Sequence, residues 1–286
     1  MSTVTVLTDS VACLSPELRS RLGIGMVGIC ITLDGQLYHD GIDLRTEEFY
    51  ARMGEAISHK TASPSVGDWL AVMQTAVDAG AGGLLVVTLA HRFSNTYDSA
   101  RSAAKLVSVP AVVVDSRTVA AAQGLYVRRL AEDAAAGVTL DALVQRAHDR
   151  RGCYRLEFVL EGLSRVAATG RLPSTVARLG DAVEVKPMLT LGPRAEMRAI
   201  GVARGTRSGI ERIYRRLLKV FPEATPGRVV VSHALMEDDA IGLADRLRSD
   251  RPELDVEVAL FTPVMVASVG PIIGVAWEDP ALIAER

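Results

Sequence analysis

Cysteine is scarce in this sequence, and the few cysteines form no recognisable motif. The 286 residues include 3 cysteines, Cys13, Cys30 and Cys153, which lie far apart and contain no CxxC pair. An odd number of scattered thiols is typical of proteins in a reducing compartment. It argues against a disulfide framework and against a zinc site built from thiolates. We therefore expect a cytoplasmic protein whose cysteines are free.

Long hydrophobic segments are also missing. The longest apolar runs, such as Ile24–Leu33, are short and contain glycine, so none is long enough to cross a bilayer as a helix. The opening residues MSTVTVLTDS carry neither the basic region nor the apolar stretch of a signal peptide. The sequence thus predicts no secretion signal and no stable insertion into a membrane.

Neither sign of charge predominates. The chain has 32 Lys+Arg against 34 Asp+Glu, a formal net charge of -2, and its arginines are scattered. Such a balance gives no general attraction to nucleic acid or to an anionic membrane. With 49% hydrophobic and 23% charged residues, the composition is that of a folded globular protein long enough for two domains.

Several motifs that carry common chemistry do not occur. No GxGxxG follows the first expected strand, and no GxxxxGK[ST] or GxSxG occurs, so the usual dinucleotide, P-loop and hydrolase loops are absent. The five histidines show no HxxxH or HExxH spacing. We expect no cofactor, no metal and no catalytic residue. A Ser/His/Asp triad dispersed along the chain stays open, because triads are defined by geometry.

Buried strands alternate with helices in the first half of the chain. Short apolar runs predict strands at Val4–Leu7, Gly83–Leu89 and Ala111–Val114. Helices are predicted at Leu14–Leu22, Val66–Ala79, Tyr97–Leu106, Thr118–Ala136 and Thr139–Arg150. Strands without polar alternation are covered on both faces, so this half predicts an α/β fold with a doubly wound parallel sheet.

The second half has a mixed character. Strands are predicted at Val183–Thr190, Arg198–Arg204, Arg228–Ser232 and Leu254–Leu260, and helices at Ser208–Val220 and Glu237–Arg248. Gly192-Pro193 indicates a hairpin turn, and the Gly- and Pro-rich segment 268–274 indicates further turns. We expect an α/β domain at residues 1–160, a second α+β domain at residues 161–286, and a ligand site between them.

Hydroxyl-rich loops occur at strand ends or helix starts. They are Thr8-Asp9-Ser10, the segment 61–65, Ser94-Asn95-Thr96 and Asp115-Ser116. Ligands of open α/β sheets bind at the carboxyl ends of the strands, where helix N-termini favour anions. The alternative is that these residues only cap helices, as we expect of Ser65. Thr61 is not needed for that cap.

The same segments, taken in order, resemble the DegV family, the bacterial fatty-acid-binding proteins that include the FakB subunits of fatty acid kinase. The matching motifs cover nearly the whole chain: VLTDS from Val6, KTASPS from Lys60, SNTYDSA from Ser94, VDS from Val114 with Gln123-Gly124, GRL from Gly170, and KPML from Lys186. Each motif alone is weakly specific, but six in the family's order are strongly specific.

The resemblance implies a function and a set of site residues. It implies a protein without catalytic activity of its own that buries a long-chain fatty acid, binds the carboxylate through the hydroxyls of Thr61 and Ser94, and presents it to a separate, ATP-binding fatty acid kinase subunit. Ser63 lies in the same loop as Thr61. Asn95 either adds an amide donor or tolerates a left-handed turn, and Arg171 faces the carboxylate, a partner or solvent.

The sequence departs from the family near its C-terminus. The family usually has His-x-Gly-Pro-Gly there, with a histidine that helps to hold the carboxylate, whereas this chain has Ser268-Val-Gly-Pro-Ile. Ser268 is therefore either a candidate contact in place of the histidine or a turn residue. This departure implies weakened or rearranged carboxylate binding, or a different head group.

The apolar part of such a site would be a long tunnel. Ile24–Leu33, Leu156–Leu163 and Phe261–Ile273 are candidates to line it, or else ordinary core. Two other functions stay open. One is an enzyme that binds a small acidic or phosphorylated metabolite at the same loops, and the other is a lipid-sensing regulatory subunit of an unrelated partner.

Overall fold

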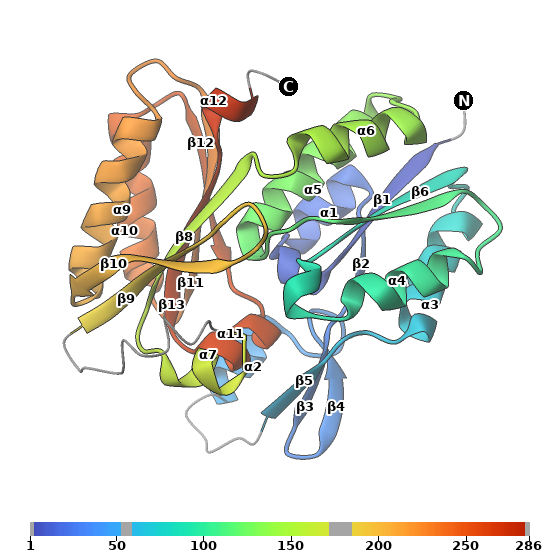
Figure 1. The fold of residues 1–286 in the computed structure, drawn as a ribbon, viewed down its shortest axis with the longest axis horizontal. Helices are drawn as coiled ribbons and strands as arrows, with labels where there is room; N and C mark the ends of the chain where they lie inside the picture. The colour runs from blue at the N-terminus through green and yellow to red at the C-terminus, as the bar shows by residue number, and fades with distance from the viewer. Residues whose placement is uncertain (1–2, 53–58, 172–184, 284–286) are drawn as a thin grey trace. The chain divides into compact units, whose positions relative to one another are not determined.

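The computed structural model describes residues 3–52, 59–171 and 185–283 (Figure 1). The chain forms two compact units. The first unit comprises Met1–Arg151 with Thr262–Val264, and the second comprises Gly152–Phe261 with Met265–Arg286. Each unit has its own main sheet and its own hydrophobic core.

A parallel four-stranded sheet organises the first unit. Its strands, in spatial order, are β2 (Gly25–Val27), β1 (Val4–Asp9), β6 (Gly83–Thr88) and β7 (Ala111–Asp115). All three pairings between neighbours are parallel. Every residue of β6 is buried, as a central strand covered on both faces requires.

Helices lie on both faces of this sheet (Figure 1). They are α1 (Pro16–Leu22), α3 (Val66–Asp78), α4 (Thr96–Ala104), α5 (Ala120–Ala135) and α6 (Leu140–Arg150). Helices α3 and α4 contact each other, and their buried residues Trp69 and Ala100 pack with Leu84 of β6. Helix α5 packs against β1, and α6 packs against β6.

A small antiparallel sheet is inserted between β2 and α3. Its strands, in spatial order, are β4 (Gln36–His39), β3 (Cys30–Leu33) and β5 (His59–Ala62), and α2 (Thr46–Arg52) lies in the chain between β4 and β5. The β3–β4 hairpin turns at Asp34-Gly35, with φ of 48° and 87°. Two central residues with positive φ define the turn type that Asp-Gly favours.

The second unit is built on a six-stranded mixed sheet. Its strands, in spatial order, are β10 (Met197–Arg204), β9 (Val185–Leu191), β8 (Tyr154–Leu160), β13 (Ile272–Glu278), β11 (Gly227–Ala234) and β12 (Leu254–Leu260). Only β11 and β12 pair in parallel, and α10 (Glu237–Asp250) connects them. Helices α9 (Thr206–Val220) and α10 contribute Ile213 and Leu243 to the core of this unit.

Short helices complete the described chain. They are the 3-10 turns η1 (Ser10–Ala12) and η2 (His91–Phe93), and the helices α7 (Ser164–Ala168), α11 (Pro263–Val269) and α12 (Pro280–Ile283). Among the described residues, no helix combines the length and the hydropathy that crossing a membrane requires.

The structure confirms the expected fold class, an α/β unit with a parallel sheet followed by a second unit with mixed strands. The turns expected at 268–274 are wrong in part, because α11 extends to Val269 and β13 begins at Ile272. The compact units part at Arg151, so β8 pairs within the second sheet. The domain boundary after residue 160 and the ligand site between domains stay predictions.

Candidate functional site

The Thr8-Asp9-Ser10 turn holds the end of β1 in place. The Thr8 hydroxyl donates to the Val87 carbonyl at 2.8 Å. The Asp9 carboxylate accepts from Leu89 N–H at 2.7 Å and from Val11 N–H at 3.1 Å, and it thereby caps η1. All three residues of this turn are buried. This loop therefore has a structural role, in agreement with the alternative that its residues cap a helix.

Ser10 connects β1 to the small sheet. Its hydroxyl donates to Asp40 Oδ2 at 2.8 Å and accepts from Ile29 N–H at 3.1 Å. Burial raises the pKa of Asp40 from 3.8 to about 7 and that of Asp9 from 3.8 to about 6, and hydrogen bonds offset this only in part. These carboxyls belong to the interior of the first unit.

The Asp115-Ser116 turn is also structural. Asp115 Oδ1 accepts from His91 N–H at 3.1 Å and from Arg117 N–H at 2.9 Å, and Ser116 bonds to Thr118 on both its donor and acceptor sides. In helix α5 the buried Gln123 donates to the Thr8 hydroxyl at 3.1 Å. The motif that follows β7 is therefore hydrogen-bonded to the motif at the end of β1.

The segment 61–65 joins β5 to α3. Thr61 pairs with the buried Ile31 in the β3–β5 ladder and is half-buried, and its hydroxyl has no hydrogen-bond partner among the residues that the structure describes. Ser65 caps α3 as expected: it accepts from Asp68 N–H at 3.1 Å, while Asp68 Oδ2 accepts from Ser65 N–H at 2.8 Å. Ser63, between them, is not used by this capping box.

Ser63 meets Ser94 although 31 residues separate them. Their Oγ atoms lie 2.7 Å apart, and Ser94 Oγ lies 2.7 Å from Thr96 Oγ1. We call Ser63, Ser94 and Thr96 the hydroxyl cluster. Ser63 precedes α3 and Ser94 precedes α4, and the two helices pack together, which brings their N-terminal ends into reach of each other.

Within the part of the chain that the structure describes, the hydroxyl cluster has one O–H group more than its internal hydrogen bonds use. Three hydroxyls carry three O–H groups, and the two links between them use only two. Ser94 Oγ also accepts from Thr96 N–H at 3.3 Å. Ser63 and Ser94 are half-buried and Thr96 is fully buried. The two serines are therefore the members of the cluster that a ligand can reach. This arrangement can donate to an anion without bringing a charge of its own.

Asn95 lies beside the cluster at the start of α4. Its φ of -77° and ψ of 9° exclude the left-handed turn that its asparagine allowed, and its side chain makes no capping hydrogen bond. Its exposed amide remains available as a donor. Thr96, which the sequence analysis placed in a hydroxyl-rich loop but not among the ligand contacts, is the third member of the cluster; its position two residues after Ser94, at a helix start, was the available signal.

Arg171 and Ser268 belong to the second unit. Arg171 follows α7 and is half-buried, with its N–H donating to the Thr169 hydroxyl at 3.3 Å. Ser268 lies inside α11, so its interpretation as a turn residue is wrong. Lys186 of β9, in the KPML motif, donates to Glu161 Oε2 at 2.7 Å.

Comparison with known proteins assigns the chain to one family over nearly its whole length. A model of the DegV family, described as uncharacterised proteins, matches residues 3–279. A DegV domain-containing protein of Streptomyces coelicolor is 30% identical over 270 residues, which cover 94% of this chain and 95% of the relative. One of Listeria monocytogenes is 27% identical over 280 residues, covering 96% and 98%.

Solved structures show the same fold. A DegV lipid-binding protein of Thermotoga maritima superposes with a TM-score of 0.86 at 26% identity and covers 97% of this chain and 98% of its own. A DegV family protein of Thermus thermophilus, described for its fatty acid binding, has a TM-score of 0.85 at 25% identity and covers 97% and 99%. The chain therefore belongs to the DegV family.

Proposed function

We propose that this protein binds a long-chain fatty acid and holds its carboxylate at the hydroxyl cluster. The observation that carries the proposal is the pair of half-buried serines, Ser63 and Ser94, joined at 2.7 Å with an O–H donor to spare. The Thermus thermophilus relative described for its fatty acid binding and the lipid-binding relative from Thermotoga maritima support the ligand class. Thr61 and Asn95 are the further donors that we assign to the carboxylate.

Binding energy and orientation come from different parts of such a ligand. Removing an acyl chain from water is worth about 0.8 kcal/mol for each methylene, before the cost of ordering the chain. A neutral hydrogen bond contributes about 1 kcal/mol. The tail therefore dominates the affinity, and the hydroxyls fix which end of the ligand reaches the cluster. Arg171 and Ser268 stay as proposed contacts on the second unit.

We also propose that the chain has no catalytic activity of its own and presents the bound acid to a separate ATP-dependent kinase subunit. Neutral donors support this role. An arginine fork would occupy both carboxylate oxygens with strong, charge-assisted bonds, whereas hydroxyls leave the oxygens more nucleophilic toward a phosphoryl group. Co-purification with a subunit that forms acyl phosphate from ATP tests the proposal. A partner of another kind would favour the regulatory alternative.

The carboxylate site is tested by serine variants. Ser94→Ala and Ser63→Ala each weaken oleate binding about 5- to 30-fold, the loss of about 1–2 kcal/mol of hydrogen bonding. Ser102→Ala is the matched control, because Ser102 lies on α4 and its exposed hydroxyl donates only to the Asp98 carbonyl, at 3.0 Å. Mass spectrometry of lipid extracted from the purified protein, and titration of oleate into delipidated protein, measure these effects.

Two outcomes would contradict this function. One is a preparation that carries no lipid and takes up neither palmitate nor oleate. The other is stabilisation by inorganic phosphate or a sugar phosphate but not by fatty acid, which would favour an enzyme of small acidic metabolites. If Ser94→Ala unfolds, the hydroxyl cluster has a structural role in the loop and is not the carboxylate site.

A further inference from the structure

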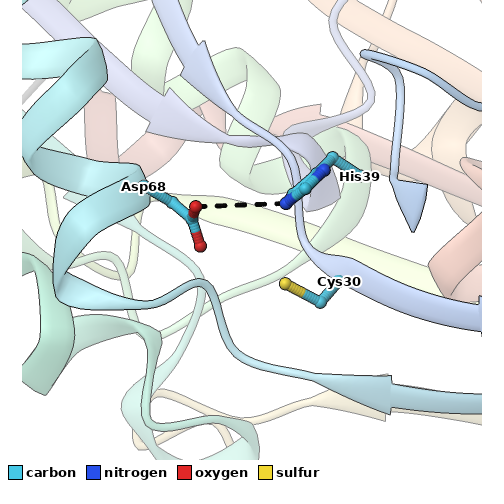
Figure 2. Close-up of side chains that lie close together, drawn as sticks. All are labelled: Cys30, His39 and Asp68. Carbon is cyan, nitrogen blue, oxygen red and sulfur yellow. Dashed lines mark ion pairs between the residues drawn. The ribbon is translucent and has the colours of Figure 1, made fainter. Parts of the chain in front are cut away.

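Three side chains with metal-binding atoms converge beside the β3–β4 hairpin. They are Cys30 of β3, His39 of β4 and Asp68 of α3, and one ligand atom from each lies within 4.8 Å of the others. Figure 2 shows the Cys30 sulfur directed toward the space next to the His39 and Asp68 side chains. The ladder explains the first pair, since Cys30 and His39 are directly opposite each other and share one face.

A second carboxylate orients the imidazole. His39 Nδ1 lies 3.0 Å from Asp43 Oδ2, and the His39 N–H donates to the other oxygen of Asp43. With Nδ1 engaged in this way, Nε2 is the free nitrogen, and it lies 3.9 Å from Asp68 Oδ1. Histidines that bind metals characteristically use the remaining ring nitrogen to bond a carboxylate in this manner.

The aspartate ligand is oriented as well. Asp68 Oδ2 accepts from Ser65 N–H in the capping box of α3, which leaves Oδ1 directed at His39. The close approach of the hairpin depends on Gly28, where a Cβ atom would lie 2.9 Å from the Asp40 carbonyl oxygen and from His39 Cβ. Backbone packing and a second hydrogen bond thus fix His39 and Asp68, while Cys30 is fixed by the ladder.

The distances and exposure fit a small cation. Zinc bonds of about 2.0–2.3 Å at tetrahedral angles separate ligand atoms by about 3.3–3.8 Å, so ligand atoms within 4.8 Å of one another need to approach by at most about 1.5 Å to close on the ion. Cys30 is 8% exposed, whereas the His39 and Asp68 side chains are 33% and 31% exposed. The ion would therefore be reached from solvent past the histidine and aspartate.

We propose that Cys30, His39 and Asp68 form a binding site for a thiophilic divalent cation, with Zn²⁺ the best match and a water molecule in the fourth position. One thiolate, one neutral imidazole and one carboxylate is a ligand set that zinc accepts and that magnesium and calcium do not favour. A thiolate and a carboxylate also balance the charge of a divalent ion. On binding, the sulfur–metal bond forms and the thiol proton passes to the solvent.

The charges around the cluster suit a divalent cation. The carboxylates of Asp43 and Asp68 lie on either side of the His39 ring, 3.0 Å from Nδ1 and 3.9 Å from Nε2. A divalent ion would supply positive charge beside these carboxylates. The sequence expectation of no metal overlooked this set, since its ligands come from a strand ladder and a helix start.

The test is a titration of the full-length, chelator-treated protein with Co²⁺ and with Zn²⁺. We expect one ion per chain, a thiolate-to-cobalt charge-transfer band, and release of one proton. Cys30→Ser removes the band and lowers Zn²⁺ affinity at least 100-fold, and Asp43→Asn lowers it about 10-fold because it only orients His39. Cys13→Ser is the control, since Cys13 is a free thiol outside the cluster.

Metal stoichiometry, the cobalt band and proton release are measured without a fatty acid. The metal site is therefore tested independently of the proposed function. Circular dichroism checks the fold of each variant, and His39→Gln gives a second disruption on a partly exposed strand if Cys30→Ser is unstable. Failure to bind one Zn²⁺ per chain at micromolar free metal would overturn the site. Persistence of the cobalt–thiolate band in folded Cys30→Ser or His39→Gln would overturn it equally.

Discussion

Asp40 has no exposed surface and lies near other acidic groups, so its carboxyl group is sensitive to pH. Burial raises the pKa of the nearby Cys13 thiol to about 12, and the charges of Asp40 and Asp9 add to that shift. Asp40 also adds to the raised pKa of Tyr50. Protonation of Asp40 removes an uncompensated charge from this interior.

The free energy of unfolding should therefore fall as the pH rises. The pKa of Asp40 is raised from 3.8 to about 7, so the folded state holds a proton that the unfolded state has released between about pH 4 and pH 7. The stability present below pH 4 is lost across this window, by about 2–4 kcal/mol. Asp40→Asn should flatten the decline and raise stability at pH 8, as measured by urea unfolding at each pH.

A surface aspartate provides the control. Asp78 at the end of α3 is exposed and accepts from Gln74 at 2.8 Å, so Asp78→Asn should change stability by less than about 0.5 kcal/mol and keep the slope. An Asp40→Asn variant with the same pH slope as the unsubstituted protein would contradict the assignment of the titration to Asp40.

At the level of single residues, the sequence identified the hydroxyl-rich loops, but it did not show which of their residues are structural and which are available to a ligand. Asp9 and Ser63 both occur in hydroxyl-rich loops, and only the structure separates a buried cap from a half-buried member of the cluster. The difference depends on which distant backbone N–H reaches the side chain, such as Leu89 N–H for Asp9. Such contacts depend on the packing of strands and cannot be derived from local sequence.

Two glycines inside helices differ in the space that their surroundings leave for a side chain. Gly124 lies in α5, where an added Cβ would come 2.4 Å from the Ala12 carbonyl oxygen of η1. Gly242 lies in α10, where a Cβ would meet nothing within 4 Å. Helix propensity favours alanine over glycine at both positions by about 1 kcal/mol. The surroundings therefore decide whether a Gly→Ala substitution raises or lowers the stability.

We expect opposite outcomes from the same substitution. Gly124→Ala should destabilise the protein by about 1–3 kcal/mol or more, because the helix must move away from a backbone atom. Gly242→Ala should stabilise it by about 0.5–1 kcal/mol. Urea-induced unfolding measures both. Equal stabilisation by the two variants would mean that α5 does not approach η1 as closely as described.

The elements that sequence analysis found are those with strong local patterns. The helices and the apolar strands of the first sheet belong to this group, as does the β9–β10 hairpin. The small sheet was missed although Asp34-Gly35 is a strong hairpin signal, because its strands are only four residues long. Strand β8 was interpreted as part of an apolar run available for a tunnel, and β13 was missed beyond its first two residues, since their pairing joins segments more than 100 residues apart.

At the scale of the whole molecule, ligand binding and stability are linked. A ligand that binds only the folded protein stabilises it by RT ln(1 + [L]/Kd), which is about 2.7 kcal/mol at 100 times the dissociation constant. Oleate should therefore raise the Tm of delipidated protein by several degrees, and inorganic phosphate should leave it unchanged. Without ligand, Ser94→Ala should unfold close to the unsubstituted protein, because Ser94 is only half-buried.

The variant should differ only when oleate is present. If the loss of the Ser94 hydroxyl weakens binding tenfold, the same oleate concentration stabilises Ser94→Ala by about 1.4 kcal/mol, so the rise in Tm is about halved. Ser102→Ala, on the same helix but outside the hydroxyl cluster, should keep the full rise. Thermal unfolding of the three proteins with and without oleate measures this difference. An equal rise in all three would place the carboxylate away from Ser94.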